Sequence, residues 1–328
     1  MRIALSILFI LLLVPGYSGI PQRALWSPPV DVTAKRVALF SDAPGRKQLG
    51  ELTYLGGVEL HSSDPAFGGF SSMTLDRDGR FTLLNDGGNW LRMRLDSNWQ
   101  VQQAQTGTLP GGPGTGWRKA ERDSESMTRD PETGARWVGF ESANEIMRYD
   151  DDFTRSTGWV QPIAMAEWPE NGGAESMVRL HDGRFIVLSE TGNWPHAKGR
   201  AAICFSGDPV AAPNRGFRFA YRPPKGYSPS DAVELPGNRL LVLNRELSLR
   251  RWFTAKLTIV PIAAIAPGRL VTGREIASFE SPALHDNFEA LAVTHEKGRV
   301  VIWIASDDNQ SLFQKSYLLK FALPLPPR

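Results

Sequence analysis

Cysteine is almost absent from this chain. Cys204 is the only cysteine among its 328 residues, so no disulfide can form within the chain. Cys204 lies in the apolar run Ala201–Phe205, where we expect a small buried side chain rather than a nucleophile. Stability must therefore come from packing of the core, to which a bound metal ion could add.

An excess of charge of one sign is also missing. The 37 Lys and Arg residues nearly balance the 35 Asp and Glu residues, which gives a net charge of +2. Such a balance creates no strong overall field toward nucleic acid or an anionic membrane surface. We therefore expect no nucleic-acid partner.

Hydrophobic runs long enough to span a membrane comfortably are lacking. The run at the N-terminus, Ile3–Val14, follows Arg2 and precedes the small-residue segment Pro15–Ser18. These features predict a signal peptide over residues 1–18, cleaved after Ser18, and a mature domain over residues 19–328. The expected location is the periplasm or the medium, with no membrane span left after cleavage and no cysteine at the cleavage site for a lipid anchor.

Common catalytic signatures are missing as well. The segment Gly69–Met73 departs from Gly-x-Ser-x-Gly at its last position, so a nucleophile elbow is not indicated. The five histidines show no metal-ligand spacing. Only His285 stays a candidate, because it adjoins Asp286 and Asn287 in an acidic turn.

What the chain does contain is an internal repeat. An acidic or polar turn leads into a short apolar segment, a tight turn, and a second apolar segment that ends in polar, mostly acidic residues. The clearest copy is Asp286–Val293 followed by Val300–Asn309. Weaker copies begin at Gly69, Asp123, Gly173 and Ser230, so the unit occurs five times.

Each copy can be divided into four strands. In the second copy they are Glu125–Arg129, Ala135–Glu141, Glu145–Tyr149 and Gly158–Ala164. Helical periodicity is weak throughout, and turn residues recur at short intervals. The repeat therefore predicts an all-β fold, a single β-propeller of five four-stranded blades, or six if Leu247–Phe279 is divided differently.

The last copy ends one strand short. After Tyr317–Leu323 the chain reaches its proline-rich end, whereas a spare strand, Glu51–Leu60, precedes the first copy. We expect this N-terminal strand to complete the C-terminal blade and so close the ring, which leaves no exposed sheet edge at the seam.

Propeller geometry brings acidic residues to one end of the central channel. The first strand of each blade begins at one face, and the antiparallel second strand returns to that face. Acids before the first strands should therefore meet those after the second strands: Glu125, Glu175, Asp231, Glu289, Asp86, Glu141, Glu190, Glu246, Asp307 and Asp308. Their repulsion must be offset by a cation, a bound proton or a basic neighbour such as Arg245.

Oxygen ligands without histidine or cysteine suit Ca²⁺ among the common metals. The predicted calcium ligands are Glu125, Glu175, Asp231, Glu289, Asp307 and Asp308. The candidate catalytic residues are Glu125, Glu175, Glu289, Arg245 and His285. In the alternative interpretation these acids cap turns by accepting backbone N–H groups.

Several of these motifs resemble a known family, the bacterial phytase-like domain described as having "esterase-like activity of phytase". The resemblance rests on Phe67–Ser71, Asp123–Glu125, Gly173–Glu175, Asp286–Glu289 and Ser306–Asn309, and extends over about Leu52–Leu323. It implies an exported propeller with a hydrolase activity, distantly similar to the calcium-dependent propeller phytases. Those phytases bind phosphate through a basic cluster, and this chain departs from them because it has no comparable Lys/Arg motif beyond Arg245, Arg122 and Lys119.

Two functions stay open at this point. One is an exported hydrolase in which a metal ion and an acid act on a small phosphoester or carboxylic ester at the channel mouth. The other is a non-catalytic propeller that binds or assembles components of the cell envelope with the same face. The fold hosts both kinds of protein, and the sequence does not define an oligomeric state.

Overall fold

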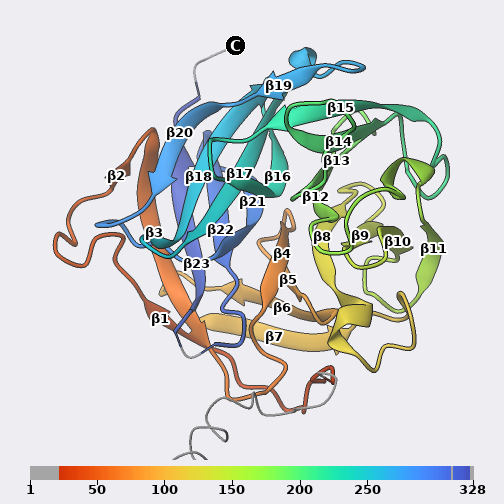
Figure 1. Ribbon diagram of the computed structural model, residues 1–328. Coiled ribbons are helices and arrows are strands. Elements are labelled where there is room, and N and C mark those ends of the chain that lie inside the picture. Colours follow the sequence, from red (N-terminus) through yellow and green to blue (C-terminus); the bar gives the residue numbers. More distant parts are fainter. Residues whose placement is uncertain (1–21, 312, 326–328) are drawn as a thin grey trace, which may run out of the picture.

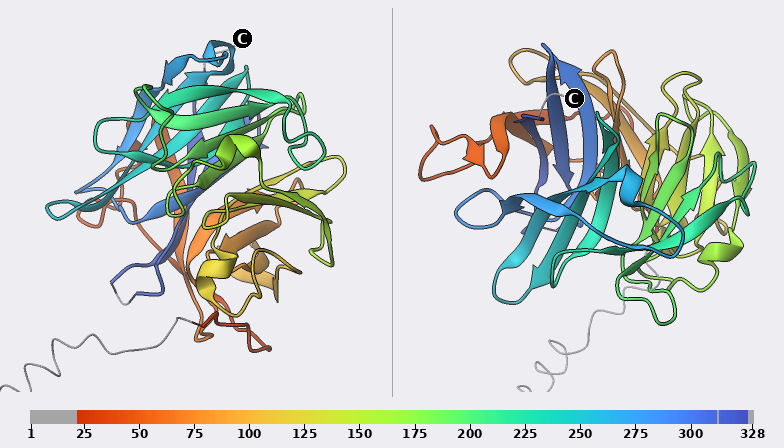
Figure 2. Two further views of the ribbon diagram at one scale, coloured as in Figure 1. Left: turned by 45° about the vertical axis from the view of Figure 1, so that its right-hand side comes forward. Right: turned by 90° about the horizontal axis from the view of Figure 1, so that it is seen from above.

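Five antiparallel sheets stand around a central axis in the computed structural model, which describes residues 22–311 and 313–325 (Figure 1). The predicted all-β propeller with five blades is confirmed. The side views show the twisted blades packed around the ring, with loops and a long hairpin projecting from it (Figure 2). The predicted signal peptide, residues 1–18, lies outside the described residues.

The blades follow one another along the chain, and in blades 1–4 the innermost strand comes first. Blade 1 holds β4 (Phe70–Leu75), β5 (Phe81–Asn85), β6 (Asn89–Leu95) and β7 (Val101–Thr108). Blade 2 holds β8 (Ser124–Arg129), β9 (Arg136–Phe140), β10 (Glu145–Tyr149) and β11 (Ser156–Val160). Blade 3 holds β12 (Ala174–Arg179), β13 (Phe185–Ser189), β14 (Arg200–Phe205) and β15 (Gly216–Arg222). Blade 4 holds β16 (Ser228–Leu235), β17 (Arg239–Ser248), β18 (Trp252–Pro261) and β20 (Arg274–Phe279).

Blade 5 combines the two ends of the described chain. It holds β21 (Phe288–Glu296), β22 (Arg299–Ser306), β23 (Ser316–Leu323), β3 (Leu52–His61) and β1 (Thr33–Arg36), and β2 (Gln48–Leu49) also pairs with β3. Strand β3 runs antiparallel to β23. The predicted closure is therefore confirmed.

The seam between β3 and β23 is tightly packed. Gly57 is opposite Leu319, and a Cβ atom at Gly57 would come within 2.5 Å of a methyl group of Leu319. A side chain at this position would therefore have to move the side chains of Leu319 and Tyr54.

The six-blade division of Leu247–Phe279 is not observed. Strands β18 and β20 of that stretch complete blade 4, and β19 (Leu270–Thr272) joins blade 3 in parallel with β15. Helical structure in the described residues consists of short 3-10 turns: η1 (Lys119–Arg122), η2 (Ile163–Met165) and η3 (Ile262–Ala264). None of the helices in the described part of the chain is long and apolar enough to cross a membrane.

The innermost strand of every blade carries a β-bulge near its start. The bulged residues are Ser71, Glu125, Glu175, Ser230 and Glu289. A bulge places two residues opposite one and redirects the side chain at that point. Since neighbouring inner strands contact one another around the ring, the five bulges meet at one face, which we call the acid face.

Apolar side chains fill the spaces between blades. The three methionines two residues after the first three bulges, Met73, Met127 and Met177, are buried in separate inter-blade clusters. Cys204 is likewise buried, in the cluster between blades 3 and 4, as expected of a small apolar side chain. These clusters hold the blades rigidly and fix the inner strands that carry the bulges.

Candidate functional site

The second strands supply another ring of charges at the acid face. In each blade one residue of the second strand pairs with the residue before the bulge. The next residue is charged in all five blades: Asp86, Glu141, Glu190, Arg245 and Asp307. Four blades therefore place an acid at this position, and blade 4 places an arginine there.

The bulges and the ends of the second strands, with Asp123 just before β8, form an acid cluster, which we define as Asp86, Asp123, Glu125, Glu141, Glu175, Glu190, Glu289 and Asp307. Its members are buried or half-buried. Eight acids packed this way repel one another strongly when all are ionised.

Arg245 is the principal cation of the cluster. Its guanidinium Nη2 lies 3.1 Å from Glu190 and 3.4 Å from Glu175, and its Nε lies 3.3 Å from Glu289. Burial alone would lower the pKa of Arg245, but the surrounding glutamates raise it above its ordinary value. Arg245 therefore stays charged and joins blades 3, 4 and 5 at the centre of the acid face.

A second cation arrives from a loop. Lys119, in the connection between blades 1 and 2, places its Nζ 2.5 Å from Asp86. Burial lowers the pKa of Lys119, yet the attraction of Asp86 outweighs this and raises it. Two cations against eight acids leave a formal surplus of six negative charges in the acid cluster.

Two groups of three carboxylates are close enough to share a metal ion. Asp123, Glu125 and Glu141 form one group, and Glu141, Glu175 and Glu190 form the other. Within each group the ligand oxygens lie within 4.8 Å of one another. Glu141 belongs to both groups, so it links blade 2 with blade 3.

Burial and crowding shift the proton affinity of the cluster. Burial, followed by the neighbouring Glu175 and Asp123, raises the pKa of Glu125 well above its ordinary value. Burial and Asp123 raise the pKa of Glu141 to about 7, although the Gly172 N–H donates to its carboxylate and opposes the shift.

The same causes act on the other members. The pKa of Glu175 is raised well above its ordinary value by burial and by Glu190, against the attraction of Arg245. Burial and the neighbouring Glu289 raise the pKa of Asp307 well above its ordinary value. The cluster therefore holds protons near neutral pH unless another cation replaces them.

Asp231, a predicted calcium ligand, lies one residue beyond its bulge and outside the acid cluster. Its Oδ2 accepts the N–H of Leu291 at 2.6 Å, and its Oδ1 accepts the N–H of Ala232 at 2.7 Å. Ser230 occupies the bulge instead, since the repeat in blade 4 is shifted by one residue. Asp231 therefore joins the inner strands of blades 4 and 5.

The remaining predicted residues make local contacts. Asp308 accepts the Gly69 N–H at 2.9 Å and the Ser316 hydroxyl at 2.8 Å, as the turn-capping interpretation expects. His285 hydrogen bonds through Nδ1 with the Ala283 carbonyl at 2.8 Å. Glu246 pairs with Arg251 on the hairpin beyond the ring. A functional role for His285 stays a prediction.

The sequence predicts the ring of acids but not every residue that could bind a metal ion there. Asp123, Glu141 and Glu190 were not among the predicted ligands, although the two groups of carboxylates depend on them. The signal for Asp123 was the spacing of two in Asp123-Ser124-Glu125. The signal for Glu190 and Glu141 was their equivalent position at the ends of second strands.

The donor set fits a hard cation. Every candidate ligand is a carboxylate oxygen, and Oδ1 of Asp86 is buried with no hydrogen-bond partner among the described residues. Carboxylate-only sites favour Ca²⁺ over softer metals. The residues present therefore suit the calcium ion that the sequence predicted.

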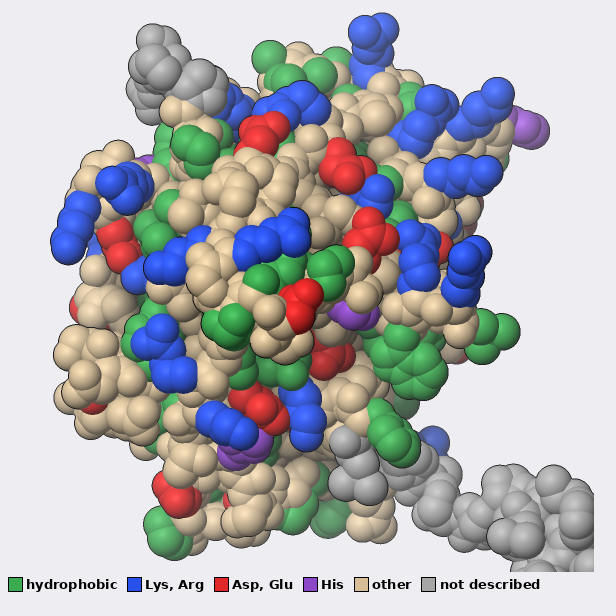
Figure 3. Space-filling model, turned by 90° about the vertical axis from the view of Figure 1, so that its left-hand side faces the viewer, with side chains coloured by type: hydrophobic (Ala, Val, Ile, Leu, Met, Phe, Trp, Pro, Cys, Tyr) green, Lys and Arg blue, Asp and Glu red, His purple; other side chains and the backbone are tan. Residues whose placement is uncertain are grey.

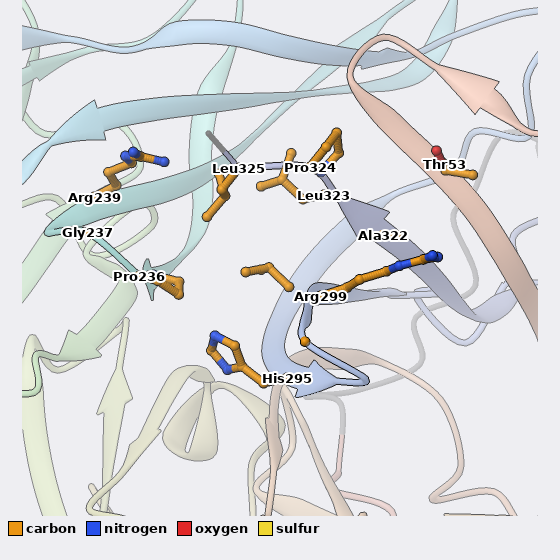
Figure 4. A pocket seen from close by; sticks show the side chains of 12 residues that line it. Thr53, Pro236, Gly237, Arg239, His295, Arg299, Ala322, Leu323, Pro324 and Leu325 are labelled. Carbon is orange, nitrogen blue, oxygen red and sulfur yellow. The ribbon is translucent and has the colours of Figure 1, made fainter. Parts of the chain in front are cut away.

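Two cavities of the described chain lie away from the cluster. The inner strands enclose one of about 310 Å³, lined in part by Met127, Met177 and Asp231. A larger one of about 540 Å³ opens between blades 4 and 5 at the opposite ends of their strands. There Leu323 and Leu325 line the middle, and Arg239 and Arg299 do not converge on a common point (Figure 4).

The fold and the charged cluster define a five-bladed propeller with a recessed acidic site at one end of its channel. Residues 65–310 match the family "Phytase-like: Esterase-like activity of phytase". This chain belongs to that family, as the resemblance of its motifs implied. No curated protein matches the sequence.

Solved structures with a similar arrangement are distant. They include Kuenenia stuttgartiensis hydrazine synthase (TM-score 0.36, 12% identity, 74% of this chain and 58% of that chain covered). The Pan2 WD40 domain of Neurospora crassa gives a TM-score of 0.36 at 7% sequence identity, and the match covers 80% of this chain and 91% of that chain. A chain of a nidogen/laminin complex gives a TM-score of 0.42 at 8% sequence identity, and the match covers 87% of this chain and 93% of that chain. Likeness at this level says nothing about the activity of the present chain.

Proposed function

We propose that this protein is an exported, calcium-assisted hydrolase of a small phosphoester or carboxylic ester, with its site at the acid cluster. The observation that carries the proposal is the surplus of buried acids, eight carboxylates with Arg245 and Lys119 as their cations. Membership of a family described by esterase-like activity supports the same reaction class. Export rests on the predicted signal peptide.

Each of the two groups, Asp123 with Glu125 and Glu141 or Glu141 with Glu175 and Glu190, would hold an ion. When bound, calcium would supply Lewis-acid polarisation of an ester oxygen. Glu289, which lies outside both ligand groups and whose pKa is raised mainly by burial, is suited to accept a proton from water and return it to a leaving group. Arg245 is positioned to attract an anionic substrate group and to hold Glu175 and Glu289 in place.

The test compares native protein with Glu175→Gln and with Glu246→Gln. The control makes the same chemical change on the same face, but outside the acid cluster. Hydrolysis of nitrophenyl phosphate and nitrophenyl acetate is measured with calcium and with a chelator. We expect calcium-dependent turnover in native protein and in the control, and a loss of about a hundredfold or more in Glu175→Gln, of the size usual for loss of electrostatic stabilisation.

Absence of turnover in native protein, together with calcium binding, would contradict the hydrolase and favour the non-catalytic binding propeller. Turnover that survives in Glu175→Gln would place the reaction elsewhere on the molecule. Export is tested separately by N-terminal sequencing of protein from the envelope fraction, where an intact Met1 would contradict it.

A further inference from the structure

The two faces of the propeller differ in their exposed apolar side chains. The most exposed large hydrophobic residues in the described chain are Leu249, Phe313, Trp117, Ile163, Leu247 and Trp159, from fully exposed to 62%. Leu249, Phe313, Trp117 and Leu247 lie in or next to connections at the acid-face ends of the strands, whereas Ile163 lines a cavity with Pro213 and Asn214 of the β14–β15 connection at the other face. An exposed leucine by itself is ordinary, but a set gathered on one face indicates an interaction surface.

The hairpin of β17 and β18 contributes most to this set. In blades 1, 3 and 5 the second strand ends at the residue that pairs with the one before the bulge. The equivalent residue of β17 is Asn244, and β17 continues four residues beyond it, to Ser248. At about 3.3 Å per residue the hairpin projects roughly 13 Å beyond the other blades. Regular pairing continues through Ser248 opposite Trp252, so the projection is ordered β-structure.

The tip of that hairpin combines apolar and basic groups. Leu247 and Leu249 are exposed and Trp252 is 55% exposed. The exposed Arg250 lies between them, whereas Arg251 is paired with Glu246 and Glu280. Tryptophan, leucine and arginine in this arrangement suit the boundary of a lipid bilayer, where apolar groups insert and cations meet anionic headgroups.

Other loops of the same face add single apolar tips. Phe313 projects from the β22–β23 connection of blade 5, and Trp117 projects from the loop before η1. Exposed Lys225 and Lys198 lie on connections of this face, as do the exposed Glu167 and Glu170, and Lys315 pairs with Glu59. In Figure 3 the acid face lies at the right-hand edge, and hydrophobic and basic side chains project there next to one another.

We infer that the acid face docks on an anionic lipid surface through the β17–β18 tip and Phe313. Separate projecting side chains insert independently into a fluid bilayer, whereas a protein partner needs a continuous complementary surface. The acids of the cluster are buried or half-buried and partly neutralised by Arg245 and Lys119, while the exposed Arg250 stands on the projecting hairpin tip. The net charge of +2 for the whole chain hides this local distribution.

The test is flotation of the full mature chain with vesicles of equal parts phosphatidylcholine and phosphatidylglycerol, in chelator so that calcium cannot bridge protein and lipid. The variants are Leu247→Glu/Leu249→Glu and Phe313→Glu. The control is Trp159→Glu, an equally exposed apolar residue on the outer strand β11. These positions are exposed, so folding should be retained and is checked by the melting temperature.

We expect native protein and Trp159→Glu to float, and the hairpin double variant to partition about a hundredfold more weakly, since two buried leucines are lost. Arg250→Gln should weaken binding about fivefold on anionic vesicles and leave binding to phosphatidylcholine alone unchanged. Glu175→Gln should float like native protein, which separates this test from that of the hydrolase. Native protein that stays unbound, or equal flotation of all variants, would overturn the inference and favour a protein partner for this face.

Discussion

At the scale of single residues, Arg245 is the feature that makes the acid cluster compatible with a folded protein. It stands at the one blade position where the repeat would otherwise place a fifth acid, and it contacts three glutamates from two other blades. A buried charge network of this kind is weak evidence for net stabilisation, but removal of one partner is costly.

Arg245→Gln should therefore destabilise the protein by about 3–5 kcal/mol in chelator, because Glu175 and Glu289 lose their cation. Calcium or mild acid should restore part of the loss by supplying positive charge or protons. Thermal unfolding in chelator, in calcium and at pH 5 checks this. The matched control is Arg250→Gln on the exposed hairpin tip, which should change stability by less than about 0.5 kcal/mol. An Arg245→Gln protein as stable as native in chelator would show that the acids do not need the arginine.

The raised pKa values also set a pH dependence. Folding raises the pKa of Glu141 from 4.5 to about 7, so between these values the folded state holds a proton that the unfolded state has released. Stability in chelator should then fall as pH rises through this window, by up to about 3 kcal/mol for Glu141 alone. Melting temperatures from pH 4.5 to 8 in chelator measure it. Stability that rises with pH across this range would contradict the assignment.

At the scale of elements, the repeat predicted the strands but not their exact phase. The four strands of blade 2 agree with the prediction to within a few residues: β10 has the predicted bounds, β8 differs by one residue at its start and β9 by one residue at each end, and β11 (Ser156–Val160) starts two residues and ends four residues earlier than expected. The bulges were not foreseen, because a bulge depends on pairing with the next strand and leaves little local signal. For this reason Asp231 was placed in the ring, whereas Ser230 holds that position, and Arg245 rather than Glu246 is the equivalent of Glu190.

The closing seam gives a prediction about packing. Gly57→Val should destabilise the protein by about 1–3 kcal/mol, because the added atoms overlap Leu319 and Leu318 of β23. Gly45→Val serves as the control, since nothing lies within 4 Å of a Cβ atom there. Urea unfolding of both variants measures the difference. Equal midpoints would mean that the seam yields easily and does not determine the stability of the ring.

At the scale of the whole molecule, closure of the ring explains why residues far apart in the sequence form one site. Five copies of one unit repeat the same bulge and the same strand end, and the ring brings these equivalent positions together on one face. The sequence was sufficient to predict that convergence, because it follows from symmetry alone. It was not sufficient to predict which acids approach within ligand distance, or that Lys119 enters from a loop, since these depend on the packing of side chains.

The most direct test of this account is thermal unfolding with calcium and with a chelator, for native protein, Glu289→Gln and the control Glu246→Gln. If the acid cluster holds calcium, the ion should stabilise native protein by about 2.7 kcal/mol at a hundredfold excess over its dissociation constant. Glu289→Gln should respond less, because one negative charge has left the cluster, and Glu246→Gln should respond like native protein. A native melting temperature that is the same in calcium and in chelator would contradict the metal site and leave the acids as buried, protonated groups.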